Sequence, residues 1–545
     1  MEATPVVPAV VTDDDARLAS LGYKPQLNRV LGFFSNFAVA FTYLSPMVGI
    51  YSLFILGVGT GGPSYIWLTL IPLIGMLFVA LVFGELASHY PVAGGMYQWS
   101  KFSVGPKFGW FVGWFYGIAL LVTVASVDAG VVSYFTALTH NWFGWNLDPA
   151  AHGTILWVTL ALLAIQTTLN ITGASVMARV ARFGVYVEIL GTFGIFLILW
   201  IHGFNHGLGF LFHSQGAEHV ATNGYGANFH GHWLTGAALI AVLAPVYIFY
   251  GFESCGDIAE ETKDASRQIP KAMRAALIWG GIASLFLTAG LLLAMPDNNP
   301  VAATVKGGGV PFILGQLSEG MQDFLLCLII FAFFSCGTSI QGAGSRLAFS
   351  FARDGALPGS GWISKVHDRF KTPVNALLMG AVITILFVLL VFPSPKHNID
   401  IWFITYPANV NVLVSLISFA VSGIYLSFLL AVIAAMVAHA RGWRPEGAFR
   451  LGRWTWPVLI IAVGYLGLML ANVVAPTGLD SPRALFNLDW ITATVIFVIA
   501  VIGAIIFLVA RPDRKVRGHL HDELEPTPAE HVTGTPPVAP GAAAP

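Results

Sequence analysis

The sequence has few charged residues for its length. Only 10% of its 545 residues are Asp, Glu, Lys or Arg, whereas 56% are hydrophobic, and the mean hydropathy is +0.74. An ordinary soluble domain carries about 25% charged residues, so this composition excludes that class and indicates a polytopic membrane protein. The net charge of -1 offers no basic surface, so we expect no nucleic-acid partner.

Cysteine is also scarce, and familiar catalytic motifs are missing. Cys255, Cys327 and Cys336 all lie in apolar segments, which indicates neither a disulfide framework nor a zinc site. The chain contains no HExxH metal site, nucleophile elbow or Walker phosphate loop, which argues against a membrane enzyme and against self-contained ATP-driven transport. Neither tail is long enough to fold an output domain easily, which argues against a sensor. We expect no cofactor and no metal.

Long apolar runs are what the sequence does contain. A bilayer crossing needs about 20 helical residues, and twelve segments reach roughly that length. Their approximate limits are 30–57, 64–88, 107–138, 154–173, 181–202, 234–259, 271–295, 319–350, 374–392, 409–439, 455–475 and 489–510. We therefore predict an all-α polytopic membrane protein with twelve transmembrane helices in residues 30–510. Residues 1–29 and 511–545 are predicted to be disordered tails.

The basic residues predict the orientation of these helices. Positive loops are retained in the cytoplasm, and with both termini inside, all but three of the 27 Lys and Arg residues fall in cytoplasmic loops or tails. The exceptions are Lys306, Lys396 and Arg483. We expect a multi-pass plasma-membrane protein with cytoplasmic N- and C-termini.

Residues 244–262, which read APVYIFYGFESCGDIAEET, carry the strongest sign of function. They begin like a membrane helix, but Tyr250-Gly251-Phe252 leads into Glu253, Ser254 and Asp257. A carboxylate at membrane depth costs about 2.5–3.5 kcal/mol on insertion scales, and Gly251 loosens the helix so that freed backbone groups can face a cavity. This pattern predicts the centre of a transport site.

Three stretches resemble those of APC (amino acid, polyamine and organocation) permeases. Residues 83–99, FGELASHYPVAGGMYQW, are similar to the signature between the second and third spans. Residues 251–270, GFESCGDIAEETKDASRQIP, resemble the sixth span and the loop after it, and residues 345–358, SRLAFSFARDGALP, resemble the end of the eighth. The chain looks closest to the amino acid/choline transporter branch, which includes fungal GABA and choline permeases and many bacterial amino acid permeases.

The resemblance implies a 5+5 inverted repeat, spans 1 to 5 against spans 6 to 10, with two additional C-terminal helices. It also implies that spans 1 and 6 are unwound around the substrate. The sequence is compatible, since Ser45-Pro46-Met47-Val48-Gly49 interrupts the first span as Tyr250-Gly251-Phe252-Glu253-Ser254 interrupts the sixth. These ten residues are the predicted substrate-binding residues. Half-helix amides suit a substrate carboxylate and free carbonyls suit an ammonium group, as in a zwitterion.

The first break departs from the family pattern. Many amino-acid members of the superfamily carry a Gly-Ser-Gly type turn there. In this chain Pro46 removes one amide donor and Met47 adds bulk, which disfavours an ordinary α-carboxylate. An amine or ω-amino acid becomes the better-fitting substrate.

Glu253 and Glu188 are the predicted proton-coupling residues. Removal from water favours the protonated form of a carboxylate, so Glu253 is a candidate proton carrier at neutral pH. The alternative is a structural carboxylate that accepts hydrogen bonds from the broken backbone. Glu188 lies about two turns from Arg182 in the fifth span, which in related transporters faces the cation site. The alternative for Glu188 is a buried pair with a polar neighbour.

The other polar and aromatic residues favour structural roles. Asp257, Glu260 and Glu261 lie near Lys263 and Arg267 and are expected to form ion pairs at an inner gate. Asp128 is expected to be structural, with proton coupling as the alternative, and Glu85 is expected to be a helix-packing or gate carboxylate rather than a ligand. The hydroxyls of Ser335, Thr338 and Ser339 are expected to bond to their own backbone, with sodium ligation as the alternative. A solvated loop, with metal capture as the alternative, is expected for His202, His206, His213, His219, His230 and His232. Of the aromatic residues Tyr43, Phe249, Tyr250 and Phe252, only Tyr250 and Phe252 are expected to act as a gate.

The sequence as a whole predicts a secondary active transporter. We expect it to import an amino acid or related amine by alternating access, coupled to protons. The partners are then a small-molecule substrate, a proton and the lipid bilayer. Exchange of one substrate for another is the alternative mechanism, which the sequence does not separate from proton symport.

Overall fold

The computed structural model of the chain describes residues 13–223, 229–391, 399–401, 404–406, 412–474 and 488–513. Within these ranges the regular secondary structure is almost entirely helical. The exceptions are two short strands, β1 (Ile399–Ile401) and β2 (Ile404–Tyr406), which pair antiparallel with Ile399 opposite Tyr406. Apart from this small hairpin, the predicted all-α fold class is confirmed.

Nine helical segments within the described residues are long and apolar enough to cross a membrane. They are Phe33–Gly61 (α2, Phe33–Leu44, and α3, Pro46–Gly61), Pro63–His89 (η1, Pro63–Thr69, and α4, Leu70–His89), Pro106–Phe143 (α6, Pro106–Gly130, and α7, Val132–Phe143), α8 (His152–Ile171), α9 (Ala174–His202), α14 (Ala265–Leu293), α17 (Glu319–Arg353), Ser415–Ala440 within α20 (Val412–Ala440), and Gly452–Val474 (η5, Gly452–Trp454, and α21, Thr455–Val474).

Three shorter apolar helices overlap the remaining predicted spans. They are Trp233–Ile248, Val374–Leu389 within α19 (Val374–Val391), and Val495–Val509 within α22 (Leu488–Ala510). The molecule is therefore a helical protein with many apolar spans, as predicted. The count of twelve crossings stays a prediction, because these three apolar stretches, as described, are shorter than the about 20 residues that one crossing requires.

The other elements are short helices before and between the long ones, and three of them make up the apolar stretch Trp233–Ile248. They are α1 (Asp13–Ser20), α5 (Gly95–Ser103), η2 (Leu208–Phe212), α10 (Val220–Asn223), η3 (Trp233–Ala237), α11 (Ala238–Ala241), α12 (Leu243–Ile248), α13 (Ser254–Asp257), η4 (Ala259–Glu261), α15 (Pro300–Lys306), α16 (Val310–Leu314) and α18 (Ser360–Ile363).

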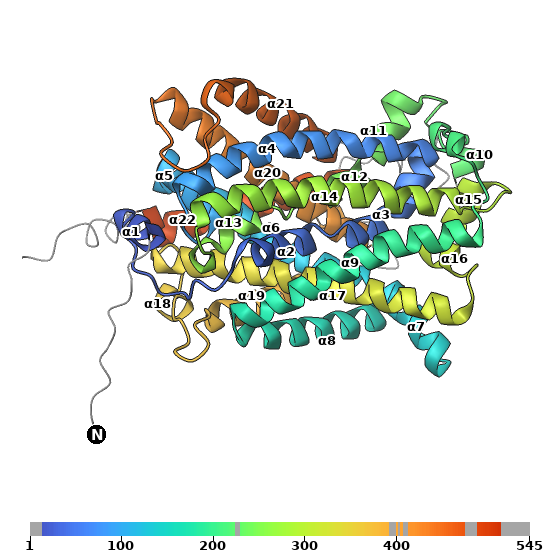
Figure 1. Cartoon of the computed structure of the whole chain (residues 1–545), viewed down its shortest axis with the longest axis horizontal. Coiled ribbons are helices and arrows are strands. Elements are labelled where there is room, and N and C mark those ends of the chain that lie inside the picture. The colour runs from blue at the N-terminus through green and yellow to red at the C-terminus, as the bar shows by residue number, and fades with distance from the viewer. Residues whose placement is uncertain are drawn as a thin grey trace, which may run out of the picture.

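The long helices run along the length of the molecule, as Figure 1 shows. α1, α5 and α18 lie at one end, whereas α10, α15 and α16 lie at the other. α2 packs against α14, α9 and α17, and α6 packs against α20, α17 and α5. Helices α2 and α6 are therefore interior elements, and both contribute to the site described below.

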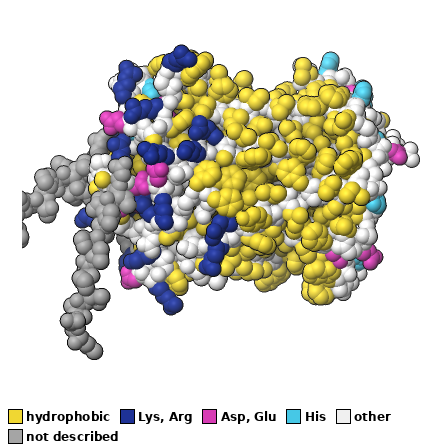
Figure 2. Space-filling model, viewed as in Figure 1, with side chains coloured by type: hydrophobic (Ala, Val, Ile, Leu, Met, Phe, Trp, Pro, Cys, Tyr) yellow, Lys and Arg dark blue, Asp and Glu magenta, His cyan; other side chains and the backbone are white. Residues whose placement is uncertain are grey.

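The surface separates charge from hydrophobic area. Figure 2 shows Lys and Arg side chains gathered toward the end that carries α1 and α18, which we call the basic end, while hydrophobic side chains cover most of the rest of this face. Large apolar side chains such as Trp157, Ile201 and Val509 are more than 70% exposed. Such a surface is stable in contact with lipid tails rather than water.

The segment before the first span is ordered where the structure describes it, so the prediction of disorder is wrong for residues 13–29. The Asp14 carboxylate accepts hydrogen bonds from Asp264 N (2.7 Å) and Ala265 N (3.2 Å), at the start of α14. Leu18 and Tyr23 are buried. These anchors, which composition does not reveal, offset the entropy lost on ordering. Residues 1–12 and 514–545, which cover most of the predicted disorder, lie outside the described residues.

A buried ion pair joins α5 to the end of α17 at the basic end. Lys101 Nζ lies 2.5 Å from Asp354 Oδ2, and Tyr97 donates a hydrogen bond to the same oxygen at 2.7 Å. Tyr23, from the N-terminal segment, donates to Asp354 Oδ1 at 2.9 Å. Burial alone would raise the pKa of Asp354, but Lys101 and Arg353 beside it hold that pKa below its ordinary value.

We predict that Lys101→Met lowers the free energy of unfolding by about 3–5 kcal/mol, because Asp354 would be left buried without its partner. Equilibrium unfolding in detergent micelles measures this change. Lys107→Met is the matched control, since Lys107 is 66% exposed and lies 3.9 Å from Asp513. It should cost less than about 1 kcal/mol. A Lys101→Met variant as stable as the control would contradict the prediction.

The same pair predicts how stability depends on pH. Because Asp354 has a lowered pKa in the folded protein, its contribution is fully present above the unfolded pKa of an aspartate, about 3.9. The contribution is lost as the pH falls through the lower pKa of the folded state. Unfolding measured between neutral and acid pH should show this loss in the wild type and not in Lys101→Met.

Candidate functional site

The break predicted in the first span is present. α2 ends at Leu44, Ser45 has a backbone φ of 36°, and Pro46 begins α3. Proline suits the first position of a helix because the N–H it lacks would have no partner there. The Ser45 hydroxyl oxygen accepts a hydrogen bond from Val48 N at 3.1 Å and so caps α3.

Glu188 of α9 reaches into this first break. The Ser45 hydroxyl donates to Glu188 Oε1, and Met47 N donates to Glu188 Oε2 at 3.2 Å. The residue is 1% exposed. A carboxylate is stabilised at this position by the unpaired amides and the positive dipole of the helix N-terminus. These contacts are those of a helix cap supplied by a distant helix, and the coupling role of Glu188 stays a prediction.

The break predicted in the sixth span is also present. α12 ends at Ile248, Gly251 has a φ of 105°, and α13 begins at Ser254. Gly251 N donates to Glu253 Oε2 at 2.7 Å, and the Ser254 hydroxyl donates to Gly251 O at the same distance. One oxygen of Glu253 therefore satisfies the broken backbone, which is the structural role weighed as the alternative from sequence.

Tyr116 of α6 connects Glu253 to a second carboxylate. Its hydroxyl lies 3.2 Å from Glu253 Oε1 and 2.8 Å from Asp257 Oδ2, and it can donate to either oxygen. All three side chains are buried. Sequence reasoning missed Tyr116, which nothing distinguishes from other aromatics in an apolar helix. The sequence did contain one signal for such a shared contact, the i, i+4 spacing of Glu253 and Asp257. This spacing places both carboxylates on one helix face.

The two breaks touch each other. A Cβ on Gly251 would lie 2.8 Å from both Leu44 N and the Tyr43 ring, and its φ also disfavours any other residue. A Cβ on Gly49 would lie 2.6 Å from the Ile248 side chain. The two segments predicted to form one site are thus in direct contact.

The ten predicted substrate-binding residues do not all face this contact. Ser45, Gly49, Gly251, Glu253 and Ser254 belong to the two breaks as described above. Tyr250 packs edge-on against Tyr43, with ring centres 6.0 Å apart. The remaining four are buried, but Met47 packs toward Gly191 of α9, Phe252 packs against Phe83 and Phe428, and no polar contact is found for Pro46 or for the Val48 side chain in the described structure.

Glu260 and Glu261 form ion pairs, as expected, but their partners are not the basic residues nearest in sequence. Glu260 pairs with Arg353, with two contacts of 2.8 and 3.0 Å, and Glu261 pairs with Arg346 at 3.0 Å. Within the described residues neither Lys263 nor Arg267 takes part in such a pair. Asp257 contacts Tyr116 instead of a cation, so its predicted ion pair is wrong.

The remaining candidates have local partners. Asp128 Oδ1 accepts from Gln166 at 2.7 Å, and Glu85 contacts His439 at 3.0 Å and Leu451 N at 2.7 Å, as expected of structural residues. Thr338 bonds to its own helix backbone, whereas Ser339 bonds to Thr42 and Ser335 has no partner among the described residues. No group of three metal-ligating side chains occurs in the described ranges, those of the His-containing loop included.

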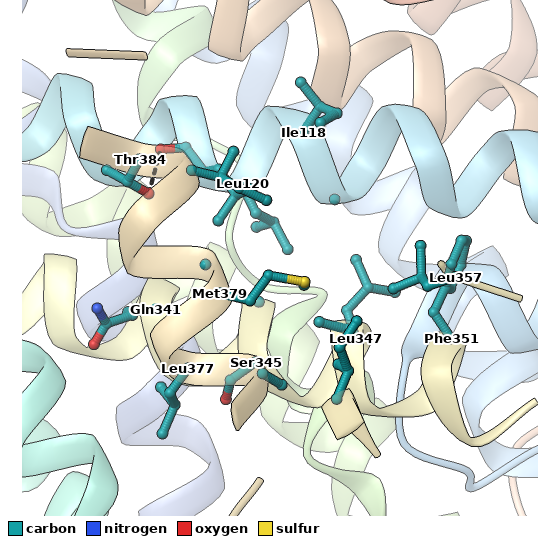
Figure 3. A pocket seen from close by; sticks show the side chains of 18 of the residues that line it. Ile118, Leu120, Gln341, Ser345, Leu347, Phe351, Leu357, Leu377, Met379 and Thr384 are labelled. Carbon is teal, nitrogen blue, oxygen red and sulfur yellow. Dashed lines mark hydrogen bonds between the residues drawn. The ribbon is translucent and has the colours of Figure 1, made fainter. Parts of the chain in front are cut away.

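A separate cavity of about 290 Å³ lies between α6, α17 and α19. Figure 3 shows that apolar side chains such as Ile118, Leu347 and Met379 line it, with Gln341, Ser345 and Thr384 as polar exceptions. None of the predicted site residues lines this cavity. The carboxylates and the freed backbone groups of the two breaks therefore lie outside this cavity. We assign the candidate site to the breaks.

Comparison with known proteins identifies the family of the chain. A family model described as amino acid permease matches residues 31–502, which covers both breaks. An uncharacterized amino-acid permease of Schizosaccharomyces pombe is 26% identical over 85% of this chain and 79% of its own length. The amino-acid permease BAT1 of Arabidopsis thaliana is 27% identical over 83% and 87%. A thiamine transporter of Schizosaccharomyces pombe is 25% identical over 86% and 81%. These relatives are transporters rather than enzymes, and the chain belongs to the amino acid permease family of the APC superfamily.

Proposed function

We propose that the protein is a secondary active transporter that imports a small amine or amino acid across the plasma membrane by alternating access. The observation that carries this proposal is the contact between two broken helices beside the buried carboxylates Glu253 and Asp257. Irregular backbone and intramembrane charge are tolerated where they serve a substrate or ion pathway. The family supports transport of a small solute in general.

The distribution of charge supports the orientation. The basic end carries α1, α5 and α18, and the described part of α22 ends there as well (Figures 1 and 2). Because Lys and Arg are retained on the cytoplasmic side, this end is the cytoplasmic one in our proposal. Both ends of the transporter domain then face the cytoplasm.

Proton coupling is proposed to act through Glu253. Its carboxylate contacts Tyr116 of α6, which also contacts Asp257 on the same segment as Glu253, and no described Lys or Arg forms an ion pair with Glu253. Two neighbouring buried carboxylates are not both ionised at low cost, so a proton shared by the pair is favoured. Glu188 is the second coupling candidate, because its protonation would weaken the cap that holds the start of α3.

Exchange of one substrate for another is the second mechanism that the same geometry allows. Liposomes that contain the purified protein distinguish the two. Accumulation of labelled GABA, choline, putrescine or an α-amino acid under an imposed pH gradient, abolished by a protonophore, supports proton-coupled import. Uptake that occurs only when the liposomes are preloaded with substrate supports exchange and removes Glu253 from proton coupling.

We predict that Glu253→Gln reduces uptake driven by a pH gradient by about 5- to 150-fold, the usual range of coupling between two ligands. The reason is that the glutamine amide, unlike a carboxyl group, does not take up and release a proton in this pH range. Initial rates measured from pH 5 to 8 should lose their pH dependence. Glu85→Gln is the matched control, because Glu85 contacts His439 away from the breaks and should keep the wild-type profile. An unchanged pH profile in Glu253→Gln would remove Glu253 from the mechanism.

We predict a different result for Glu188→Gln. The glutamine oxygen can still accept a hydrogen bond from Met47 N, so the start of α3 should keep its shape. Accumulation against a gradient should be lost, whereas counterflow between labelled and unlabelled substrate should be retained at least in part. Measuring both in the same liposomes tests the prediction, and normal accumulation would rule out a coupling role.

A further inference from the structure

We propose that the site between the two breaks accepts an organic cation that has an ammonium group and no carboxylate, with Glu253, Asp257 and Tyr43 as its recognition groups. This inference rests on the proposed transport function and names the substrate class of the same site. Three observations support it: how the amides of α3 are used, how the carboxylates are paired, and where Tyr43 lies.

The first turn of α3 has no amide left for a substrate carboxylate. Pro46 has no N–H, Met47 N bonds to Glu188, Val48 N bonds to the Ser45 hydroxyl, and Gly49 N bonds to Ser45 O at 3.0 Å. A second carboxylate at this helix end would also lie beside the one from Glu188, and like charges repel at short range. The chain itself supplies the carboxylate that a zwitterionic substrate would place there.

The second break presents two carboxylates that lack a positive partner. The Tyr116 hydroxyl has a single proton, so it donates fully to only one of Glu253 and Asp257 at a time. Asp257 Oδ1 is buried and accepts no hydrogen bond from any residue that the structure describes. The buried cations described nearby are engaged elsewhere, Arg346 with Glu261 and Arg353 with Glu260. A positive charge at this place would therefore be strongly favoured.

The position of Tyr43 indicates a ligand independently of the acids. Its hydroxyl is buried and has no hydrogen-bond partner in the described structure, and its ring lies against Gly251 of the second break. A buried polar group without a partner is costly, and a ligand that hydrogen-bonds to it removes that cost. Tyr43 also lies in the last turn of α2, where backbone carbonyls favour a positive charge.

Charge balance makes the class of substrate more specific. One ammonium group and one proton together neutralise the two carboxylates, which permits symport of a monoamine with a proton. A diamine would supply both charges and displace the proton. An α-amino acid would bring a third carboxylate for which the described residues of the first turn of α3 offer no donor.

Matched pairs of solutes test this inference on the unmodified protein. Each amino acid is compared with the amine that differs from it by one carboxylate: GABA with propylamine, ornithine with putrescine, and phenylalanine with phenethylamine. Affinity is measured by thermal stabilisation of the purified protein and by inhibition of uptake in liposomes. We expect the amine to bind at least about tenfold more tightly in the pair that the site accepts, a difference of about 1.4 kcal/mol.

The outcomes separate this inference from the proposed function. If amino acids accumulate and bind more tightly than their amines, the inference is wrong while the transport function stands. If neither member of any pair, nor choline, stabilises the protein or is taken up, both are wrong. Tighter binding of the amine together with its uptake supports both.

A variant pair locates the ammonium group. Asp257→Asn should weaken binding of the preferred amine by about 10- to 150-fold, as expected for loss of a hydrogen bond to a charged group. Asp128→Asn is the control, because Asp128 is also a buried carboxylate but is bonded to Gln166 and does not contact the breaks. Undiminished binding by a folded Asp257→Asn variant would contradict the assignment. If that variant does not fold, the comparison of matched solutes still decides the question.

Discussion

The need to satisfy the backbone polar groups that a helix break frees away from water governs both breaks in this structure. Breaking a helix inside a membrane frees amides and carbonyls that lipid cannot bind. In this chain each break is closed by a carboxylate, Glu188 at the first and Glu253 at the second. The two acids thus make an irregular backbone stable at the place where a substrate would need it. Because Glu188 comes from α9, the shape of the first break depends on a helix more than 140 positions away in the chain.

The same requirement explains why the three family-like stretches converge at the basic end. Residues 83–99 supply Ala93 N, which donates to Glu260 of the second stretch at 3.1 Å. Glu260 in turn pairs with Arg353 of the third stretch. Gly95 is suited to its place because a Cβ there would lie 2.5 Å from Asp257 Oδ1, and its φ is 40°. The three motifs therefore form one network of buried charges and not three separate sites.

Much of the fold and part of the candidate site could be predicted from the sequence, because composition and helix breakers act locally. The apolar runs predicted the long helices, and Pro46 and Gly251 predicted where the first and sixth spans are broken. Partners across the bundle could not be predicted, because they depend on tertiary packing: Tyr116 was missed, and Asp257 was assigned an ion pair that the structure replaces with that tyrosine. The order of the N-terminal segment was missed for the same reason, since Asp14 finds its partners at the start of α14.

The N-terminal segment also has a consequence for kinetics. Between Asp14 and Leu31 it bonds to the start of α14, to Asp354 and, through Leu31 N, to Glu261 O at 2.9 Å, so it lies across elements that must separate if the basic end opens. Opening of that end would then have to break these hydrogen bonds. The backbone amides of this segment would then exchange hydrogen with solvent at a rate set by that opening. Their exchange rate would therefore report how often the basic end opens.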